Sequence, residues 1–196
     1  MNDLRATFLL LAAAFMAVAG CRADPGPPPL AGAKMSNSFA LTAHDGRRLT
    51  GDAFAGKYRI VYFGYTFCPD ICPVDLQLIS AALRQFEQSD PARAARVQPI
   101  FITADPARDT QAVMADYVDN FHPRLIGLTG SADEIGRAAR DHGVTFVRRD
   151  PGEGGNYLLD HSRYTVLYGP AGEPIAFLPH DQGPQGMIDA LDRWVR

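Results

Sequence analysis

The sequence has little net charge and few cysteines, and each shortage excludes a class of protein. It contains 19 Lys and Arg residues against 22 Asp and Glu residues, a formal net charge of −3. No basic surplus is available to neutralise phosphates, so nucleic-acid binding is not expected. Three cysteines in 196 residues are too few for a disulfide-stapled scaffold, because a chain of this length can bury an adequate core. With 46% hydrophobic and 21% charged residues, the composition fits one compact domain with a short appendage.

Long apolar runs are also absent. The longest, Ala6–Gly20 (ATFLLLAAAFMAVAG), is shorter than the ~20 residues that a membrane-spanning helix needs. Its length fits the core of a signal peptide over residues 1–20, and Gly20 is the small residue that cleavage requires. The segment Val18–Cys21 (VAGC) resembles the lipobox of bacterial lipoproteins, which implies lipidation of Cys21. An uncleaved membrane anchor is the alternative, and both interpretations place the remainder outside the cytoplasm, tethered to a membrane.

Residues 21–35 are rich in Pro, Gly and Ala and show no periodic apolar pattern. This composition is typical of a semi-extended tether. We therefore expect the folded domain to occupy residues 36–196. If Cys21 is lipidated, the folded domain retains a single pair of cysteines.

Strand and helix patterns alternate through this domain. Alternation predicts a mostly parallel central sheet with helices on both faces, and a closing hairpin makes the sheet mixed. The order is that of an α/β, thioredoxin-like fold: a central mixed β-sheet flanked by helices, with an N-terminal β-hairpin extension. The predicted strands are 39–42, 58–65, 97–103, 125–128, 144–148, 162–168 and 174–178, and the predicted helices are 72–86, 110–121, 131–142 and 187–195.

The sharpest motif is Phe67–Pro73 (FCPDICP), which places Cys68 and Cys72 between a predicted buried strand and the next helix. Ligands usually bind at this carboxyl edge of an α/β sheet. Unpaired N–H groups and the positive end of the helix dipole stabilise a thiolate there. Two thiolates within one turn form a soft chelate that selects Cu(I) or Zn(II) over hard cations.

A structural disulfide between Cys68 and Cys72 is the alternative in an oxidising compartment. It would close a loop of only a few residues and so stabilise the fold little. The motif therefore favours a reactive site. The two sulfurs alone fit redox chemistry as well as metal binding, and a third ligand would favour the metal.

Among the five histidines, His161 is the best candidate for that third ligand. It stands at the entrance to a predicted strand, which faces the cysteine loop in a thioredoxin-type sheet. His180, in the loop before the last helix, is a weaker candidate. We expect His44 to be exposed in a turn, His142 to end a helix where a histidine suits the dipole, and His122 to mark a helix exit.

Three carboxylates near these motifs have simpler interpretations than catalysis. Asp70 is expected to hydrogen-bond the amides at the helix start rather than a metal. Asp109 or Thr110 is expected to cap the next helix, with Asp109 preferred, and Arg108 to pair with Asp105 or Asp109.

Four segments carry a resemblance to a known family. Tyr62–Pro73 (YFGYTFCPDICP) resembles the signature of the Sco/SenC copper chaperones, which help to assemble the dinuclear copper site of cytochrome c oxidase. The resemblance continues through 105–110 (DPARDT) and 121–130 (FHPRLIGLTG) and ends with 160–162 (DHS). The sequence departs from the family at Phe67, where relatives often carry a more polar residue, and in its lipoprotein-like start, where a transmembrane helix is common.

The resemblance implies that Cys68, Cys72 and His161 bind one copper ion, as Cu(I) or Cu(II). It implies a metallochaperone rather than an enzyme: a cell-membrane lipoprotein facing the periplasm that serves the copper-site subunit of the oxidase. A periplasmic copper donor or thiol reductant would be a further partner. The alternative is a thiol–disulfide oxidoreductase in which one cysteine attacks a disulfide of the oxidase copper site and the other resolves the product. His161 discriminates between these two functions, because copper binding needs the histidine whereas dithiol exchange largely does not.

Overall fold

The computed structural model describes residues 26–149 and 157–196. The predicted signal peptide, Cys21 and the start of the predicted tether lie outside the described residues. The elements are β1 (Ala40–Ala43), β2 (Arg48–Thr50), the 3₁₀ helix η2 (Gly51–Phe54), β3 (Tyr58–Gly64), α2 (Ile71–Ser89), α3 (Pro91–Ala94), β4 (Val97–Thr103), α4 (Gln111–Val118), β5 (Ile126–Thr129), α5 (Ala132–Asp141), β6 (Phe146–Arg149), β7 (Leu158–His161), β8 (Thr165–Tyr168), β9 (Pro174–Leu178) and α6 (Gly183–Trp194). Within this part of the chain, no helix combines the length and apolar content needed to cross a bilayer.

The main sheet of the described chain has the strand order β2-β1-β5-β4-β3-β8-β9. Strands β3, β4 and β5 are parallel, whereas β1 pairs antiparallel with β2 and β5, and β8 pairs antiparallel with β3 and β9. The predicted mixed sheet, with its N-terminal hairpin β1–β2, is therefore confirmed. Parallel pairing sends the carboxyl ends of β3 and β4 to one edge, where the cysteine loop begins.

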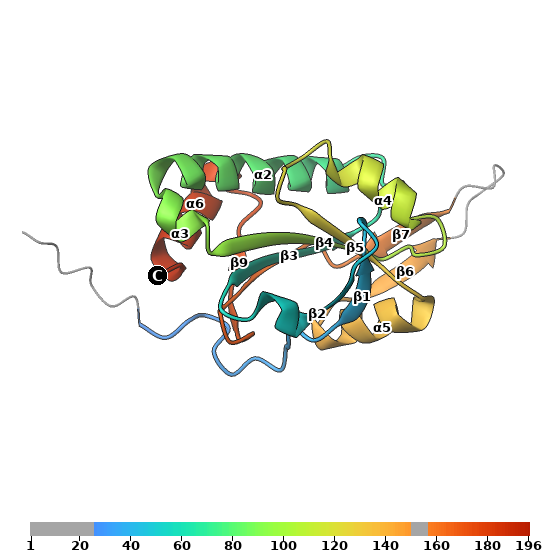
Figure 1. Cartoon of the computed structure of the whole chain (residues 1–196), viewed down its shortest axis with the longest axis horizontal. Helices are drawn as coiled ribbons and strands as arrows, with labels where there is room; N and C mark the ends of the chain where they lie inside the picture. The colour runs from blue at the N-terminus through green and yellow to red at the C-terminus, as the bar shows by residue number, and fades with distance from the viewer. Residues whose placement is uncertain (1–25, 150–156) are drawn as a thin grey trace, which may run out of the picture.

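Helices cover both faces of this sheet (Figure 1). Every residue of β3 and β4 is buried, as expected for strands covered on both faces. Successive side chains point to opposite faces. Ile60 and Tyr62 therefore join the core beneath α2, α4 and α6, whereas Val61 and Phe63 join the core beneath α5.

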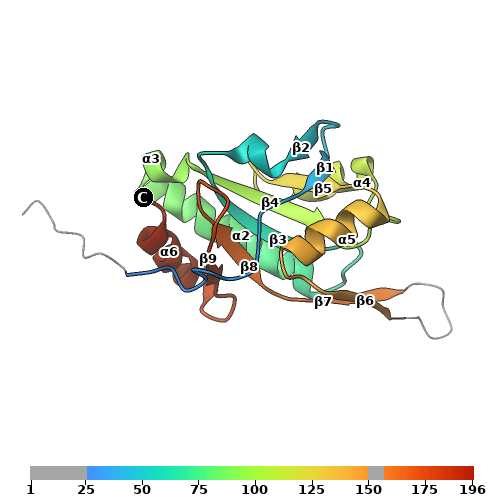
Figure 2. The same cartoon turned by 90° about the horizontal axis from the view of Figure 1, so that it is seen from below.

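A second, two-stranded sheet formed by β6 and β7 projects beside the main sheet (Figure 2). Sequence patterns predicted a strand near 144–148 but missed β7, and the strand predicted over 162–168 begins only at Thr165. The sequence LLDH of β7 alternates poorly, and its strand conformation comes from pairing with β6. Phe146 pairs with His161, so β7 carries the candidate ligand.

The chain before β1 lies against the folded domain. The backbone N–H of Leu30 donates to the carbonyl of Ile175 (3.0 Å), and that of Ser36 donates to the carbonyl of Asp141 (2.7 Å). Leu30 and Met35 pack against the α5 side of the core. Residues 26–35, which composition predicts to be tether, therefore contact the domain.

Candidate metal centre

The cysteine loop occupies residues 65–70, between the end of β3 and the start of α2. Cys68 is half-buried at the surface, whereas Cys72, in the first turn of α2, is fully buried. Gly64 makes this arrangement possible. A Cβ at position 64 would lie 2.9 Å from Sγ of Cys72 and 3.0 Å from the ring of Phe101, so only glycine lets the buried sulfur approach the strand.

The structure brings His161 to the cysteine pair, although 89 residues separate it from Cys72 in sequence. Nε2 of His161 lies 3.3 Å from Sγ of Cys72. The backbone N–H of Cys72 donates to Sγ of Cys68 at 3.4 Å. Neither sulfur is in a disulfide bond. The three predicted ligands therefore meet at one place, with His161 at the end of β7 rather than at the entrance to β8.

The ring of His161 is held in one orientation. Its Nδ1 lies 3.0 Å from the carbonyl oxygen of Ser162, an acceptor that places the ring proton on Nδ1. Nε2 is then a lone-pair donor directed at Cys72. The rings of Tyr62 and Tyr65 meet His161 edge-on at 6.2 and 6.1 Å. These contacts fix the tautomer and the orientation of the ring, as hydrogen bonds to the second ring nitrogen do for histidine metal ligands in general.

The two thiols differ in acidity. The hydrogen bond from Cys72 lowers the pKa of Cys68 to about 3, against the opposing effect of burial and with help from the backbone N–H groups of Asp70 and Cys72. The adjacent Cys68 thiolate and burial raise the pKa of Cys72. Cys68, the more exposed of the two, therefore ionises more readily than the buried Cys72.

A buried ionic cluster lies behind Cys72, and sequence patterns did not find it. Asp75, one turn further along α2, is fully buried. It accepts hydrogen bonds from Tyr62 (3.0 Å) and Arg163 (2.8 and 3.0 Å), and Nδ1 of His180 lies 2.8 Å from it. Burial opposes its ionisation, but contacts with His180 and Arg163 outweigh burial and lower the pKa of Asp75.

The weaker histidine candidates lie elsewhere. His180 contacts Asp75 and Thr165. His44 is half-buried rather than exposed, because its Nδ1 accepts the N–H of Gly127. His122 is buried beside Glu87. His142 ends α5 as expected, but burial lowers its pKa to about 4, so it is neutral and gains nothing from the helix dipole.

The carboxylates only partly follow the predictions. Arg108 pairs with Asp105, as predicted. Of the two predicted caps, Thr110 caps α4 and the preferred Asp109 does not. The buried Asp109 carboxylate instead accepts hydrogen bonds from Thr66 and Thr103, and so ties the cysteine loop to the end of β4. Asp70 stands at the N-terminus of α2 without a side-chain capping hydrogen bond, so that prediction was wrong.

Arg108 also joins the cysteine loop to the segment that leads into β7. Its guanidinium lies 3.7 Å from the ring centre of Tyr157 and 4.8 Å from that of Phe67, and it donates to the carbonyl of Tyr157 (3.0 Å). The hydroxyl of Tyr157 in turn donates to Asp105 (2.6 Å). These contacts fix the separation between the segment that carries His161 and the loop that carries Cys68.

The surface around Cys68 is apolar and shallowly hollowed. A depression of about 370 Å³ is lined by residues of the cysteine loop and of β7, among them Cys68, Ile71, Leu158 and His161. Phe67, Ile71 and Leu158 are exposed large hydrophobic residues. Among the described residues, no three His, Cys, Asp or Glu side chains already stand in a metal-binding arrangement. Within the predicted ligand set, Cys72 contacts both of the others, His161 through its Sγ and Cys68 through its backbone N–H.

Comparisons with known proteins place the chain in one family. A profile of the SCO1/SenC family matches residues 28–196. The chain is 45% identical over 134 residues to "Protein SCO2 homolog, mitochondrial" of Danio rerio, an alignment that covers 68% of this chain and 47% of the relative. The chain spans about half the length of several relatives that it matches.

Two solved structures with copper bound have the same fold. The ScoI protein of Arabidopsis thaliana superimposes with a TM-score of 0.75 at 36% identity, covering 81% of this chain and 97% of that one. The ScoI protein of Bradyrhizobium japonicum gives a TM-score of 0.73 at 33% identity, covering 82% and 99%.

Proposed function

Because the chain belongs to the SCO1/SenC family, we propose that it is a copper metallochaperone that binds Cu(I) or Cu(II) through Cys68, Cys72 and His161. The observation that carries the proposal is the 3.3 Å approach of Nε2 of His161 to Sγ of Cys72 beside the low-pKa thiolate of Cys68. Two sulfurs and an imidazole are a soft donor set that suits copper in both oxidation states. The copper-bound relatives lend further support.

Copper is the cargo of this site. Cys68 already offers a thiolate, whereas Cys72 releases its proton when the metal binds, because the thiolate is the ligand form of cysteine. The metal then leaves by exchange with thiolates of the acceptor, the copper-site subunit of cytochrome c oxidase. Such exchange needs an accessible ligand. Cys68 is half-buried in a shallow, apolar depression that a partner surface can cover.

The rest of the proposal concerns location. Residues 1–20 direct export, Cys21 carries the lipid, and the folded domain faces the periplasm. Support comes from the 15-residue apolar run and the VAGC segment. Metabolic labelling with a tagged fatty acid tests this, since a Cys21→Ser variant should lose the label, and retention of the label would contradict lipidation.

The decisive experiment is copper binding by the purified, reduced chain. Cu(I) is measured by competition with a chromophoric chelator, and Cu(II) by thiolate charge-transfer absorption. His161→Ala should weaken binding more than about tenfold, since even the loss of a group that only orients a ligand typically costs that much. His44→Ala, a histidine far from the cysteines, is the matched control and should bind normally. Tight, stoichiometric copper in the double variant Cys68→Ala/Cys72→Ala would overturn the proposal.

One observation favours a second function, reduction of the cysteines of the oxidase copper site. The two cysteines differ in exposure and acidity: Cys68 is accessible and ionises readily, whereas Cys72 is buried and keeps its proton. A dithiol reductase needs this difference, because one cysteine attacks and the other resolves the product. Cys68 would attack the target disulfide and release one target thiolate. Cys72 would then displace the second target thiolate, leaving the target reduced by two electrons and a Cys68–Cys72 disulfide for an external thiol to reduce. If His161→Ala abolished copper binding but left oxidase assembly normal, this second function would replace the first.

A further inference from the structure

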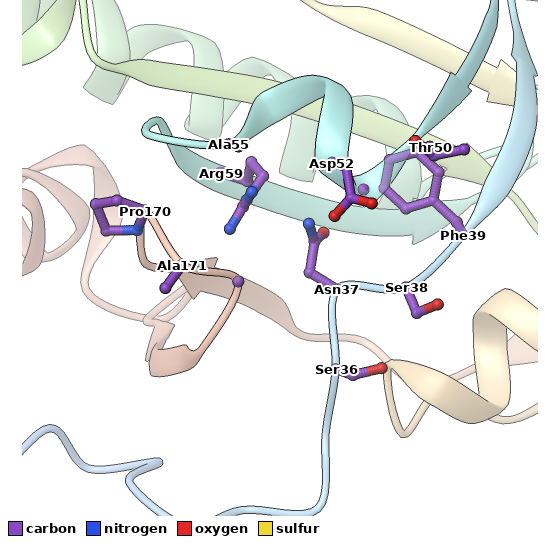
Figure 3. Close-up of a pocket in the computed structure, with 12 residues that line it drawn as sticks. Ser36, Asn37, Ser38, Phe39, Thr50, Asp52, Ala55, Arg59, Pro170 and Ala171 are labelled. Atoms are coloured by element: carbon purple, nitrogen blue, oxygen red, sulfur yellow. The ribbon is translucent and has the colours of Figure 1, made fainter.

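A polar cavity of about 460 Å³ lies at the opposite end of β3 from the cysteines. Its walls come from three segments that are distant in sequence: residues 36–39 before β1, η2 with its flanks, and the turn 170–172 between β8 and β9 (Figure 3). The volume is within the range of small-molecule sites. None of the residues that form the cysteine site contributes to it.

A buried guanidinium dominates this cavity. Arg59, the second residue of β3, is only 2% exposed. It donates to the carbonyls of Phe54 (3.1 Å) and Gly169, but its buried Nε has no hydrogen-bond partner. Across residues 26–149 and 157–196, no carboxylate lies within ion-pair distance of it. The carboxylates of Glu173 and Asp52 attract the guanidinium from a longer distance. The buried charge at the cavity wall therefore has nearby carboxylates but no direct ion pair, which is a costly arrangement.

A second unpaired group lies across the cavity. Asn37 is 7% exposed, and its buried Oδ1 has no hydrogen-bond partner. Figure 3 shows its side chain and the carboxylate of Asp52, on η2, directed into the same space as Arg59. The cavity thus presents an unused donor with a positive charge on one side and acceptors with a negative charge on the other.

We propose that this cavity binds a small zwitterion of the α-amino acid class. The carboxylate of the ligand pairs with Nε of Arg59 and the adjacent Nη in the two-pronged geometry that guanidinium groups favour. Its ammonium group donates to Oδ1 of Asn37 and faces Asp52. A dianion such as phosphate would meet the charge of Asp52, and a simple carboxylate would leave Asn37 unsatisfied. The two carbonyl contacts use one N–H of each Nη as a structural tie, and they leave Nε and the second N–H of each Nη for a ligand.

The test follows the Nε–H resonance of Arg59 by NMR in the full, metal-free chain labelled with ¹⁵N-arginine, identified by its absence in Arg59→Lys. Glycine should shift this resonance saturably. Acetate should bind about tenfold more weakly, because it lacks the charged donor, and inorganic phosphate should produce no saturable shift. Asp52→Asn changes an exposed side chain and should abolish the preference for glycine over acetate while the fold is kept.

Absence of a saturable shift with all three probes would overturn the proposal, because the cavity would then hold water and Arg59 would be a structural tie. Equal shifts with glycine, acetate and phosphate that Asp52→Asn leaves unchanged would also overturn it, since they indicate non-specific anion binding. The titration uses no copper and no cysteine chemistry. Its outcome is therefore independent of the metallochaperone proposal.

Discussion

Acid should destabilise the fold through His142, a side chain far from the chemistry of the cysteines. The imidazole is 1% exposed and packs among the rings of Phe39, Phe63 and Tyr168 at centroid distances of 5.3–6.3 Å. Its Nδ1 lies 2.7 Å from the carbonyl of Ala138, and its Nε2 has no partner. Burial lowers its pKa from 6.5 to about 4, so the folded state holds the neutral ring.

The sign and size of the effect follow from proton linkage. Between pH 6.5 and about 4 the unfolded chain binds a proton that folded His142 does not, so stability is fully present above pH 6.5 and falls as the pH drops through this window. A shift of two to three pKa units corresponds to about 3 kcal/mol in total. About 2 kcal/mol of this should be lost between pH 8 and pH 5.

Urea unfolding of the purified chain at pH 8 and pH 5 measures this loss, with His142→Phe as the comparison. Phenylalanine suits the aromatic surroundings, and the carbonyl of Ala138 keeps the backbone N–H of His142 as a donor (3.0 Å). The drop in unfolding free energy between the two pH values should be about 2 kcal/mol smaller in the variant. Other titrating groups, such as His122 with its burial-lowered pKa, act alike in both proteins and cancel. An equal drop in both would refute the reasoning.

Three further substitutions test the architecture of the site. Gly64→Ala places a methyl group 2.9 Å from Sγ of Cys72. It should lower the free energy of unfolding in urea by about 1–3 kcal/mol and weaken copper binding. Unchanged stability and unchanged copper affinity would contradict the packing argument. Asp75→Asn removes the charge at the centre of a fully buried ionic cluster and should lower the unfolding free energy by about 3 kcal/mol, whereas a change within error would mean that the cluster is energetically neutral. Tyr157→Phe removes the hydrogen bond to Asp105 (2.6 Å) and should weaken copper binding about fivefold, the equivalent of one hydrogen bond. Unchanged affinity in a chelator competition would show that Tyr157 does not position the ligands.

Local patterns in the sequence predicted most of the elements. The strand predicted over 97–103 matches β4, and Ser131 and Glu134 form the predicted capping box on α5. These features depend on residues within one turn or one strand of each other. The predicted cysteine loop also lies where expected, because a buried strand followed by a helix fixes the edge of the sheet at which the loop emerges.

Predictions failed where a partner distant in sequence decides the conformation. The strand β7 exists because Phe146–Arg149 pairs with it, and its own four residues carry no strand pattern. Asp109 is adjacent to a helix start, which suggested a cap. Its carboxylate instead accepts hydrogen bonds from the hydroxyl groups of Thr66 and Thr103. Asp75 has the sequence context of an ordinary helix residue. Its burial against Arg163 and His180 depends on how α2 lies over the sheet.

The sequence by itself determined the α/β fold class, the cysteine pair at the start of a helix and, from its place at the entrance to a predicted strand, the choice of His161 as the third candidate ligand. Only the tertiary structure decided that His161 meets Cys72 from the end of a short hairpin, that Cys68 ionises more readily than Cys72, and that the buried Arg59 lines a cavity at the far end of strand β3. The physical reason is that patterns of apolar residues report which face of an element is buried. Distances between elements, and the electrostatic consequences of burial, arise only when the elements pack together.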